Sequence, residues 1–120
     1  MKNSILVLGL LLLSACGEAS EAPEVDRSRA EYRTFVNLGC LRCHGPDLAG
    51  THKAPHLAGL DRNWTPEQLT AFLKDPQPFR ERDPRIRDLA RQYAAHEMPA
   101  YDVVDSVLVD LVDFLLAPGP

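Results

Sequence analysis

The sequence is poor in positive charge and in aromatic side chains, and both shortages limit what the protein can be. Its 120 residues contain 13 lysines and arginines against 17 aspartates and glutamates, a formal net charge of −4. Proteins that bind nucleic acids present basic faces to the phosphates, so this balance argues against a nucleic-acid partner. Aromatic residues make up only 7% of the chain, and a domain this small buries little surface. We therefore expect a disulfide, a metal or a cofactor to stabilise it.

Strand patterns and paired cysteines are also lacking. No segment alternates apolar and polar residues for long enough to predict a β-strand. The three cysteines are Cys16, Cys40 and Cys43, and an odd number excludes a fully paired disulfide framework. The sequence therefore predicts an all-α domain in which each cysteine needs its own explanation.

The amino-terminal residues have the pattern of an export signal. A positive start at 1–3 precedes an almost wholly apolar run at 5–13, which is too short to span a bilayer. The ending Leu-Ser-Ala-Cys at 13–16 resembles the bacterial lipobox, which implies cleavage before Cys16 and a lipid on its sulfur. We expect residues 1–15 to be a lipoprotein signal peptide and the domain to be exported, facing the periplasm or the cell exterior. An ordinary signal with a chance cysteine is the alternative.

The residues after the predicted leader favour a tether. Residues 17–26 are small and acidic, and they show no periodicity. Such a composition is typical of a flexible linker, and about ten residues of it reach on the order of 20 Å. We interpret 16–26 as a lipidated cysteine with a flexible acidic tether, and 27–117 as the folded domain.

Helical patterns recur through the domain. A capping-box pattern at 65–68 predicts a helix start, and Asp75-Pro76 its end. Asp83-Pro84 opens another helix, and Asp102 is expected to cap the last one. The expected inner face of the last helix consists of Val104, Val107, Leu108, Leu111 and Leu115. An earlier helical stripe consists of Tyr32, Phe35, Val36, Gly39, Cys40 and Cys43.

The strongest pattern in the chain is Cys40-Leu41-Arg42-Cys43-His44. C-x-x-C-H is the attachment pattern of c-type haem. Two thiols three residues apart lie one helical turn apart and can add to the two vinyl groups of one macrocycle. The next residue, His44, then falls under the iron as the proximal ligand. We predict one haem c, bound covalently through Cys40 and Cys43.

Three other interpretations of Cys40 and Cys43 remain open. The most serious is a zinc site, because His52 and His56 follow at nearly finger-like spacing. The interval between the two pairs is short, however, and zinc leaves the adjacent histidine unexplained. A thioredoxin-type dithiol requires a βαβ pattern that the sequence lacks. A disulfide between the two cysteines would close a strained ring.

Met98 is the predicted second axial ligand. It is the only methionine left once the predicted leader is removed. A thioether is a weak donor that favours ferrous iron and raises the reduction potential. His96 is the main alternative, and bis-histidine ligation would lower the potential. His52 and His56 are poorer candidates because they follow His44 closely and are expected on its side of the ring.

From about residue 26 to residue 116 the chain resembles the class I cytochrome c family. In that family a helix ending in C-x-x-C-H is followed by a Pro-x-Leu-x-Gly loop, middle helices, a Met-Pro loop and a terminal helix. The corresponding loops here are Pro55-His56-Leu57-Ala58-Gly59 and Met98-Pro99-Ala100-Tyr101. The resemblance implies a monohaem, cytochrome c-like fold with the helices wrapped around one covalently attached haem.

The resemblance also implies roles for single residues. The carbonyl of Pro55 would accept a hydrogen bond from the ring of His44 and so fix its tautomer. Leu57 would pack on the haem, and Trp64 would lie near a haem propionate, with a half-buried core tryptophan as the alternative. Where the family usually carries a glycine for the crossing of its first and last helices, this chain has Ala30.

The arginines between positions 80 and 91 form the one basic cluster, made up of Arg80, Arg82, Arg85, Arg87 and Arg91. Arginines at such spacing on a helix usually belong to a solvated, salt-bridged face. We adopt that interpretation and keep a docking patch as the alternative.

These patterns together predict an electron carrier rather than an enzyme. A haem with His44 and Met98 on its two faces has no open position for oxygen or peroxide, so one-electron exchange is left. We expect a membrane-anchored carrier between other redox proteins, or a subunit of an oxidoreductase complex. The alternative is a haem-based sensor or redox-enzyme subunit with an open or bis-His site.

Overall fold

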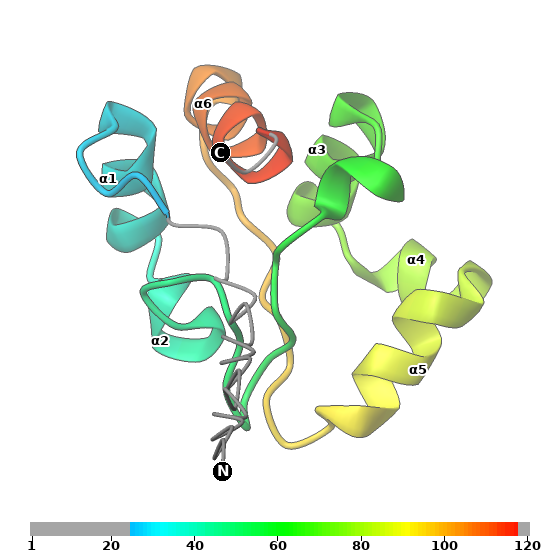
Figure 1. Ribbon diagram of the computed structural model, residues 1–120. Helices are drawn as coiled ribbons and strands as arrows, with labels where there is room; N and C mark the ends of the chain where they lie inside the picture. Colours follow the sequence, from blue (N-terminus) through cyan, green and yellow to red (C-terminus); the bar gives the residue numbers. More distant parts are fainter. Residues whose placement is uncertain (1–24, 118–120) are drawn as a thin grey trace, which may run out of the picture.

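The computed structural model describes residues 25–117, and within that range the chain is helical without a β-strand (Figure 1). In chain order the elements are α1 (Ala30–Asn37), α2 (Leu41–His44), the 3-10 helix η1 (Leu60–Arg62), α3 (Pro66–Lys74), α4 (Gln77–Arg82), α5 (Pro84–Gln92) and α6 (Asp105–Leu116). The predicted all-α class is confirmed. No helix in this range has the length and apolarity to cross a membrane. The predicted leader, Cys16 and most of the tether lie outside the described residues.

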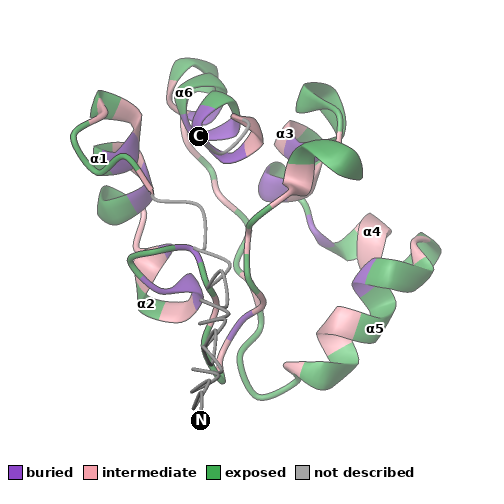
Figure 2. Cartoon of the chain, viewed as in Figure 1, coloured by how far each residue is buried: buried purple, intermediate pink, exposed green. Residues whose placement is uncertain are grey.

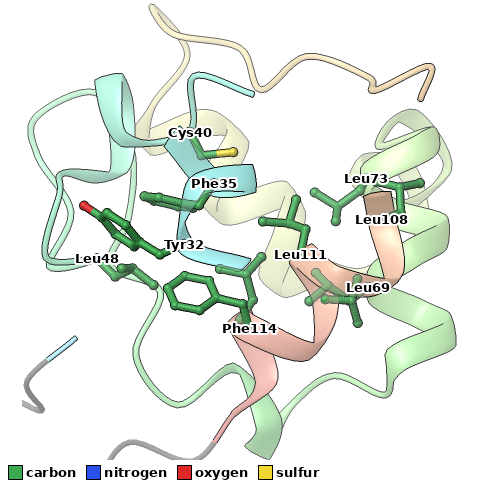
Figure 3. Close-up of a cluster of buried hydrophobic side chains, with 11 residues drawn as sticks. Tyr32, Phe35, Cys40, Leu48, Leu69, Leu73, Leu108, Leu111 and Phe114 are labelled. Carbon is green, nitrogen blue, oxygen red and sulfur yellow. The ribbon is translucent and has the colours of Figure 1, made fainter. Parts of the chain in front are cut away.

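The core forms around α6, which packs against α1, α3 and η1. The largest fully buried side chains come from these helices and are Phe35, Leu73, Leu108, Leu111 and Val112. The ring of Phe114 lies 5.8 Å from that of Tyr32 and 6.0 Å from that of Phe35, measured between centroids (Figure 3). Ala30 is exposed, so it does not fill the contact between α1 and α6. Aromatic packing makes this contact instead.

The helix that leads to the cysteines is interrupted, which corrects the single stripe predicted from the sequence. Gly39 follows the end of α1 with φ of 78°, a left-handed conformation that residues with a Cβ rarely adopt. Val36, within α1, is 38% exposed and so does not belong to the buried stripe. Phe35 and Cys40 nevertheless stay together, because the Cys40 N–H donates to the Phe35 carbonyl at 3.2 Å. The break turns the chain into α2 without separating it from the core.

The start of α3 has the predicted capping box. The Gln68 N–H donates to Thr65 Oγ1 at 3.2 Å, and the Thr65 N–H donates to Gln68 Oε1 at 3.1 Å. Pro66 occupies the first turn, where its missing N–H leaves no helical hydrogen bond unmade. α3 ends at Lys74 with Asp75 as its C-cap, in agreement with the predicted stop.

The middle of the chain holds one helix more than predicted. α4 carries Pro78 in its first turn, where proline is tolerated although it interrupts the helical pattern in the sequence. α5 begins as predicted, because Asp83 accepts a hydrogen bond from the Arg85 N–H at 2.9 Å. α4 and α5 pack on each other.

Asp102 does not cap the last helix, which corrects a second prediction. α6 begins at Asp105, and its N-cap residue Val104 makes no side-chain capping hydrogen bond. Val104 is 68% exposed and so does not belong to the inner face. The reason lies upstream, where the Tyr101 N–H donates to the Leu73 carbonyl at 2.8 Å. This bond keeps the chain extended beside α3 and delays the first turn.

Candidate cofactor site

A cavity of about 710 Å³ opens between the helices. This volume falls within the roughly 300–1,000 Å³ typical of small-molecule and cofactor sites. Each of the six α-helices contributes to its wall. The lining includes every residue predicted to contact a haem, namely Cys40, Cys43, His44, Pro55, Leu57, Trp64 and Met98. Residues that are far apart in the sequence therefore meet at one cavity.

α2 presents the two thiols at this cavity. The Cys43 and His44 N–H groups both donate to the Cys40 carbonyl, at 3.2 and 3.0 Å, so the cysteines lie about one helical turn apart. Both are free thiols, with Cys40 buried and Cys43 partly exposed. Burial raises the pKa of the Cys40 thiol, and the Tyr101 hydroxyl 4.0 Å from its sulfur opposes this effect. The pair has the spacing that attachment to one macrocycle requires.

The imidazole of His44 is held in one orientation. The side chain is buried, and Nδ1 lies 2.8 Å from the carbonyl oxygen of Pro55. A carbonyl only accepts hydrogen bonds, so Nδ1 carries the proton. Burial lowers the pKa of His44, although the bond to Pro55 acts in the other direction. Nε2 makes no hydrogen bond to residues 25–117 and is therefore the nitrogen available to a metal.

A glycine that the sequence analysis missed places the Pro55 carbonyl. The Gly50 N–H donates to the His44 carbonyl at 2.9 Å. With φ of +82°, a Cβ on Gly50 would come within 2.6 Å of the His56 nitrogen and 2.8 Å of the Pro55 carbonyl carbon. Only glycine allows the two loop segments to approach this closely. The hydrogen bond between His44 and Pro55 depends on that approach.

Leu57 and Trp64 are both half-buried on the cavity wall. Leu57 packs against the buried core cluster. The ring of Trp64 lies 5.1 Å from that of Phe72 and 5.7 Å from that of Phe79, and the Arg85 guanidinium lies 5.7 Å from its centroid. Trp64 therefore has the neighbours of a half-buried core tryptophan and also borders the cavity, so its position is compatible with both interpretations.

Both candidates for the second axial ligand border the cavity. Met98 is half-buried and packs against the core cluster. His96 is exposed, and its ring centroid lies 6.0 Å from that of His52. The Met98 carbonyl accepts a hydrogen bond from Arg80 Nη2 at 2.7 Å, a contact with no signal in the sequence. Met98 is thus the more buried of the two candidate residues.

The alternative zinc site is not supported. Across residues 25–117, no three or more cysteine, histidine, aspartate or glutamate side chains come together in a way that could hold a metal ion. His52 and His56 are both exposed, whereas Cys40 is buried. The two cysteines and the two histidines, whose spacing suggested zinc, therefore do not meet at one site.

The arginine cluster is largely ion-paired. Arg80 pairs with Glu97. Arg85 pairs with Asp83, and Arg91 with Asp88. These pairs agree with the salt-bridged interpretation of the cluster.

Comparison with known families gives these observations a context. The model of the cytochrome c family matches residues 31–117, most of the chain. The chain belongs to the cytochrome c family. This cytochrome is 26% identical over 81 residues to the menaquinol:cytochrome c reductase cytochrome c subunit of Bacillus subtilis (strain 168), with 62% of this chain and 31% of the relative aligned. The chain thus spans less than a third of that relative. No solved structure matches it significantly.

Membership of the family implies covalently bound haem c, and the site fits that cofactor. Cys40 and Cys43 offer two thiols one turn apart, and His44 offers a free Nε2 on a ring held by Pro55. The remaining wall is mainly apolar, and its aliphatic side chains include Leu57, Leu69, Leu73, Ile86, Leu89, Leu111 and Leu115. An apolar wall with few polar groups is what a macrocycle requires for burial. The donor set and the cavity therefore agree.

Proposed function

We propose that this cytochrome is a membrane-anchored monohaem carrier that passes single electrons between redox partners on the outer side of a bacterial membrane. The observation that carries the proposal is the convergence of the C-x-x-C-H segment and Met98 on one cavity. Bound haem c supplies one-electron exchange between ferrous and ferric iron. The protein holds the ring on both faces and excludes competing ligands.

Each of these residues would have its own part in holding the haem. Cys40 and Cys43 would anchor the ring, and His44 would bind the iron through Nε2. Its bond to Pro55 holds the imidazole in one orientation and increases its basicity. Met98 would be the second ligand, a role supported by its greater burial compared with His96. With His44 and Met98 both as ligands, binding of outside ligands at the iron would be disfavoured, and electron exchange would be the chemistry that remains.

Anchoring rests on the amino-terminal pattern. We propose that Cys16 carries the lipid after removal of residues 1–15, and that the acidic residues up to about 26 tether the domain. Several acyl chains attach a protein stably where a single chain binds only marginally. The tether lets the domain turn between a donor and an acceptor at the periplasmic or outer face of the membrane.

The similarity to this relative supports electron exchange with a quinol-oxidising membrane complex. The Bacillus subtilis protein is named as the cytochrome c subunit of a menaquinol:cytochrome c reductase, and most of its length has no counterpart here. We propose that this cytochrome exchanges electrons with such a membrane complex, as a tethered carrier or as one of its subunits. Contacts between electron carriers are small and brief. The net charge of −4 favours partners with positive docking faces.

Absorption spectra of the mature domain, produced with haem-maturation machinery, test the proposal. We expect a sharp c-type α-band on reduction. We also expect the weak far-red band of ferric methionine ligation, which disappears in Met98→Ala and persists in the matched control His96→Ala. Rapid stoichiometric binding of carbon monoxide to the reduced protein would contradict a carrier with both positions filled. Zinc in place of haem would overturn the cofactor assignment.

A further inference from the structure

The segment that carries Met98 is irregular chain. Residues 93–104, between α5 and α6, form turns followed by backbone without regular secondary structure. After Met98 the segment is attached to α3 by the hydrogen bond from the Tyr101 N–H to the Leu73 carbonyl, at 2.8 Å. Before Met98, a turn is closed by the His96 N–H and the Tyr93 carbonyl at 2.9 Å. Neither bond acts on Met98 itself, and a weak thioether donor does little to order a loop.

Arg80 makes the contact at Met98. Its Nη2 donates to the Met98 carbonyl at 2.7 Å, and its Nη1 donates to the Glu97 carboxylate. The Arg80 side chain is only 17% exposed, whereas that of Glu97 is 76% exposed. A guanidinium presents its donors in a rigid planar fork, so these two bonds fix two successive residues at once. The backbone from which the thioether projects is thereby fixed to α4.

The arginines of the cluster differ in how far they reach. Arg91 pairs with Asp88 three residues away. Arg85 pairs with Asp83 two residues away and also reaches the Asn63 carbonyl at 3.4 Å and the ring of Trp64. Arg80 reaches the Met98 carbonyl, 18 positions further along the chain. Its contact therefore joins two elements instead of stabilising its own helix.

Arg80 also separates two hollows. Besides the cavity of about 710 Å³, an outer hollow of about 400 Å³ lies behind the Met98 segment. The residues that line both are Gln77, Arg80, Glu97, Met98 and Pro99. These residues form the partition between the outer hollow and the cofactor cavity. Truncating Arg80 removes one of the five side chains that border both hollows.

We propose that Arg80 is a positioning residue that holds the Met98 backbone at the cavity wall and so sets how readily an outside ligand displaces the thioether. This inference rests on the proposed role of Met98 as axial ligand. Arg80 acts through the Met98 carbonyl and does not itself bind the iron. Its loss frees the loop and opens the partition, and both changes favour an incoming ligand.

Imidazole titration of the ferric, haem-loaded protein, followed by the far-red band, tests the proposal. We expect Arg80→Ala to bind imidazole at least about tenfold more tightly than the wild type, because a charged hydrogen bond to Met98 is lost. Arg80→Lys keeps the charge without the planar fork, so its affinity should be intermediate. Arg82→Ala, an exposed arginine of the same helix, is the matched control and should keep the wild-type affinity.

A wild-type imidazole affinity in Arg80→Ala would overturn the proposal, even with a lower thermal midpoint, because that pattern is the mark of a purely structural role. If Arg80→Ala takes up no haem, the imidazole affinities of Arg80→Lys and Arg80→Gln are compared with that of the wild type instead, and wild-type affinity in both would overturn the proposal. A wild-type protein without the far-red band would instead refute the ligation by Met98. The failure of this inference and the failure of the proposed function are therefore distinct results.

Discussion

The helices α1, α3 and α6 differ from α4 and α5 in how many of their side chains are buried. The helices α1, α3 and α6 bury large side chains against one another, and Leu73, Leu108 and Leu111 are at most 2% exposed. α4 has no buried residue, and α5 has one, Ile86. Figure 2 shows buried residues on α1, α3 and α6, while α4 and α5 are mostly intermediate or exposed. The helices α1, α3 and α6 therefore form a hydrophobic core with one another, whereas α4 and α5 contribute only one buried residue.

The apolar stripe of α5 explains the difference. Ile86, Leu89 and Ala90 line the cofactor cavity. α4 and α5 pack mainly on each other, and α4 also contacts α3 through the rings of Phe79 and Phe72, whose centroids lie 5.5 Å apart. Helices of nine residues or fewer are unstable alone. A haem in this cavity would complete the core for α4 and α5, whereas α1, α3 and α6 already bury large side chains against one another.

Removing the haem should produce the largest difference in stability between α4 and α5 on the one hand and α3 and α6 on the other. Without a haem, we expect amide hydrogens of 77–92 to exchange at the rate of an unfolded peptide, because the apolar face of α5 loses its partner. Peptides from 66–74 and 105–116 should keep measurable protection. Hydrogen exchange measures these rates on the wild-type chain produced without haem-maturation enzymes. The double variant Cys40→Ala/Cys43→Ala provides a second haem-free form. Equal loss in all three segments would show that these helices form one cooperative unit.

Truncating one leucine of α6 or one of α5 should have a smaller effect. Leu108 is fully buried, so Leu108→Ala should lower the unfolding free energy of the haem-loaded protein by about 2–5 kcal/mol. Leu89 is half-buried on the cavity wall, and Leu89→Ala should destabilise less. Denaturant titrations measure both variants. A Leu89→Ala variant as unstable as Leu108→Ala would mean that α5 contributes to the core as strongly as α6.

The smallest expected effect concerns the start of α5. The Arg85 side chain holds the pKa of Asp83 below its ordinary value of 3.8, so the stabilisation from Asp83 is complete above about pH 4. It is lost as the pH falls through the lowered value, when the carboxylate is protonated. Asp83→Ala should cost about 1 kcal/mol at pH 7.

Thermal melts between pH 3 and 7 measure this difference, which should shrink toward the acid end. Asp88→Ala is the matched control, because Asp88 is exposed and should change stability by less than Asp83 does. A difference between Asp83→Ala and wild type that is constant over the whole range would contradict a role for the charged carboxylate.

Sequence patterns predicted the parts of the molecule in which neighbouring residues act on one another. The capping box of α3 and the start of α5 needed only residues within three positions, and both are present. The thiol spacing of Cys40 and Cys43 is likewise a property of one helical turn. The start of α6 was predicted wrongly because its position depends on the Tyr101 N–H and the distant Leu73 carbonyl.

By itself, then, the sequence determined the all-α class, the C-x-x-C-H segment and the set of candidate ligands. The tertiary structure decided that Met98 is more buried than His96, that Gly50 lets the Pro55 carbonyl reach His44, and that Arg80 holds the Met98 backbone. The physical reason is the range of the interactions. Periodicity and capping act over one or two turns, whereas burial, close backbone approach and a guanidinium reaching 18 positions along the chain exist only after the helices have packed.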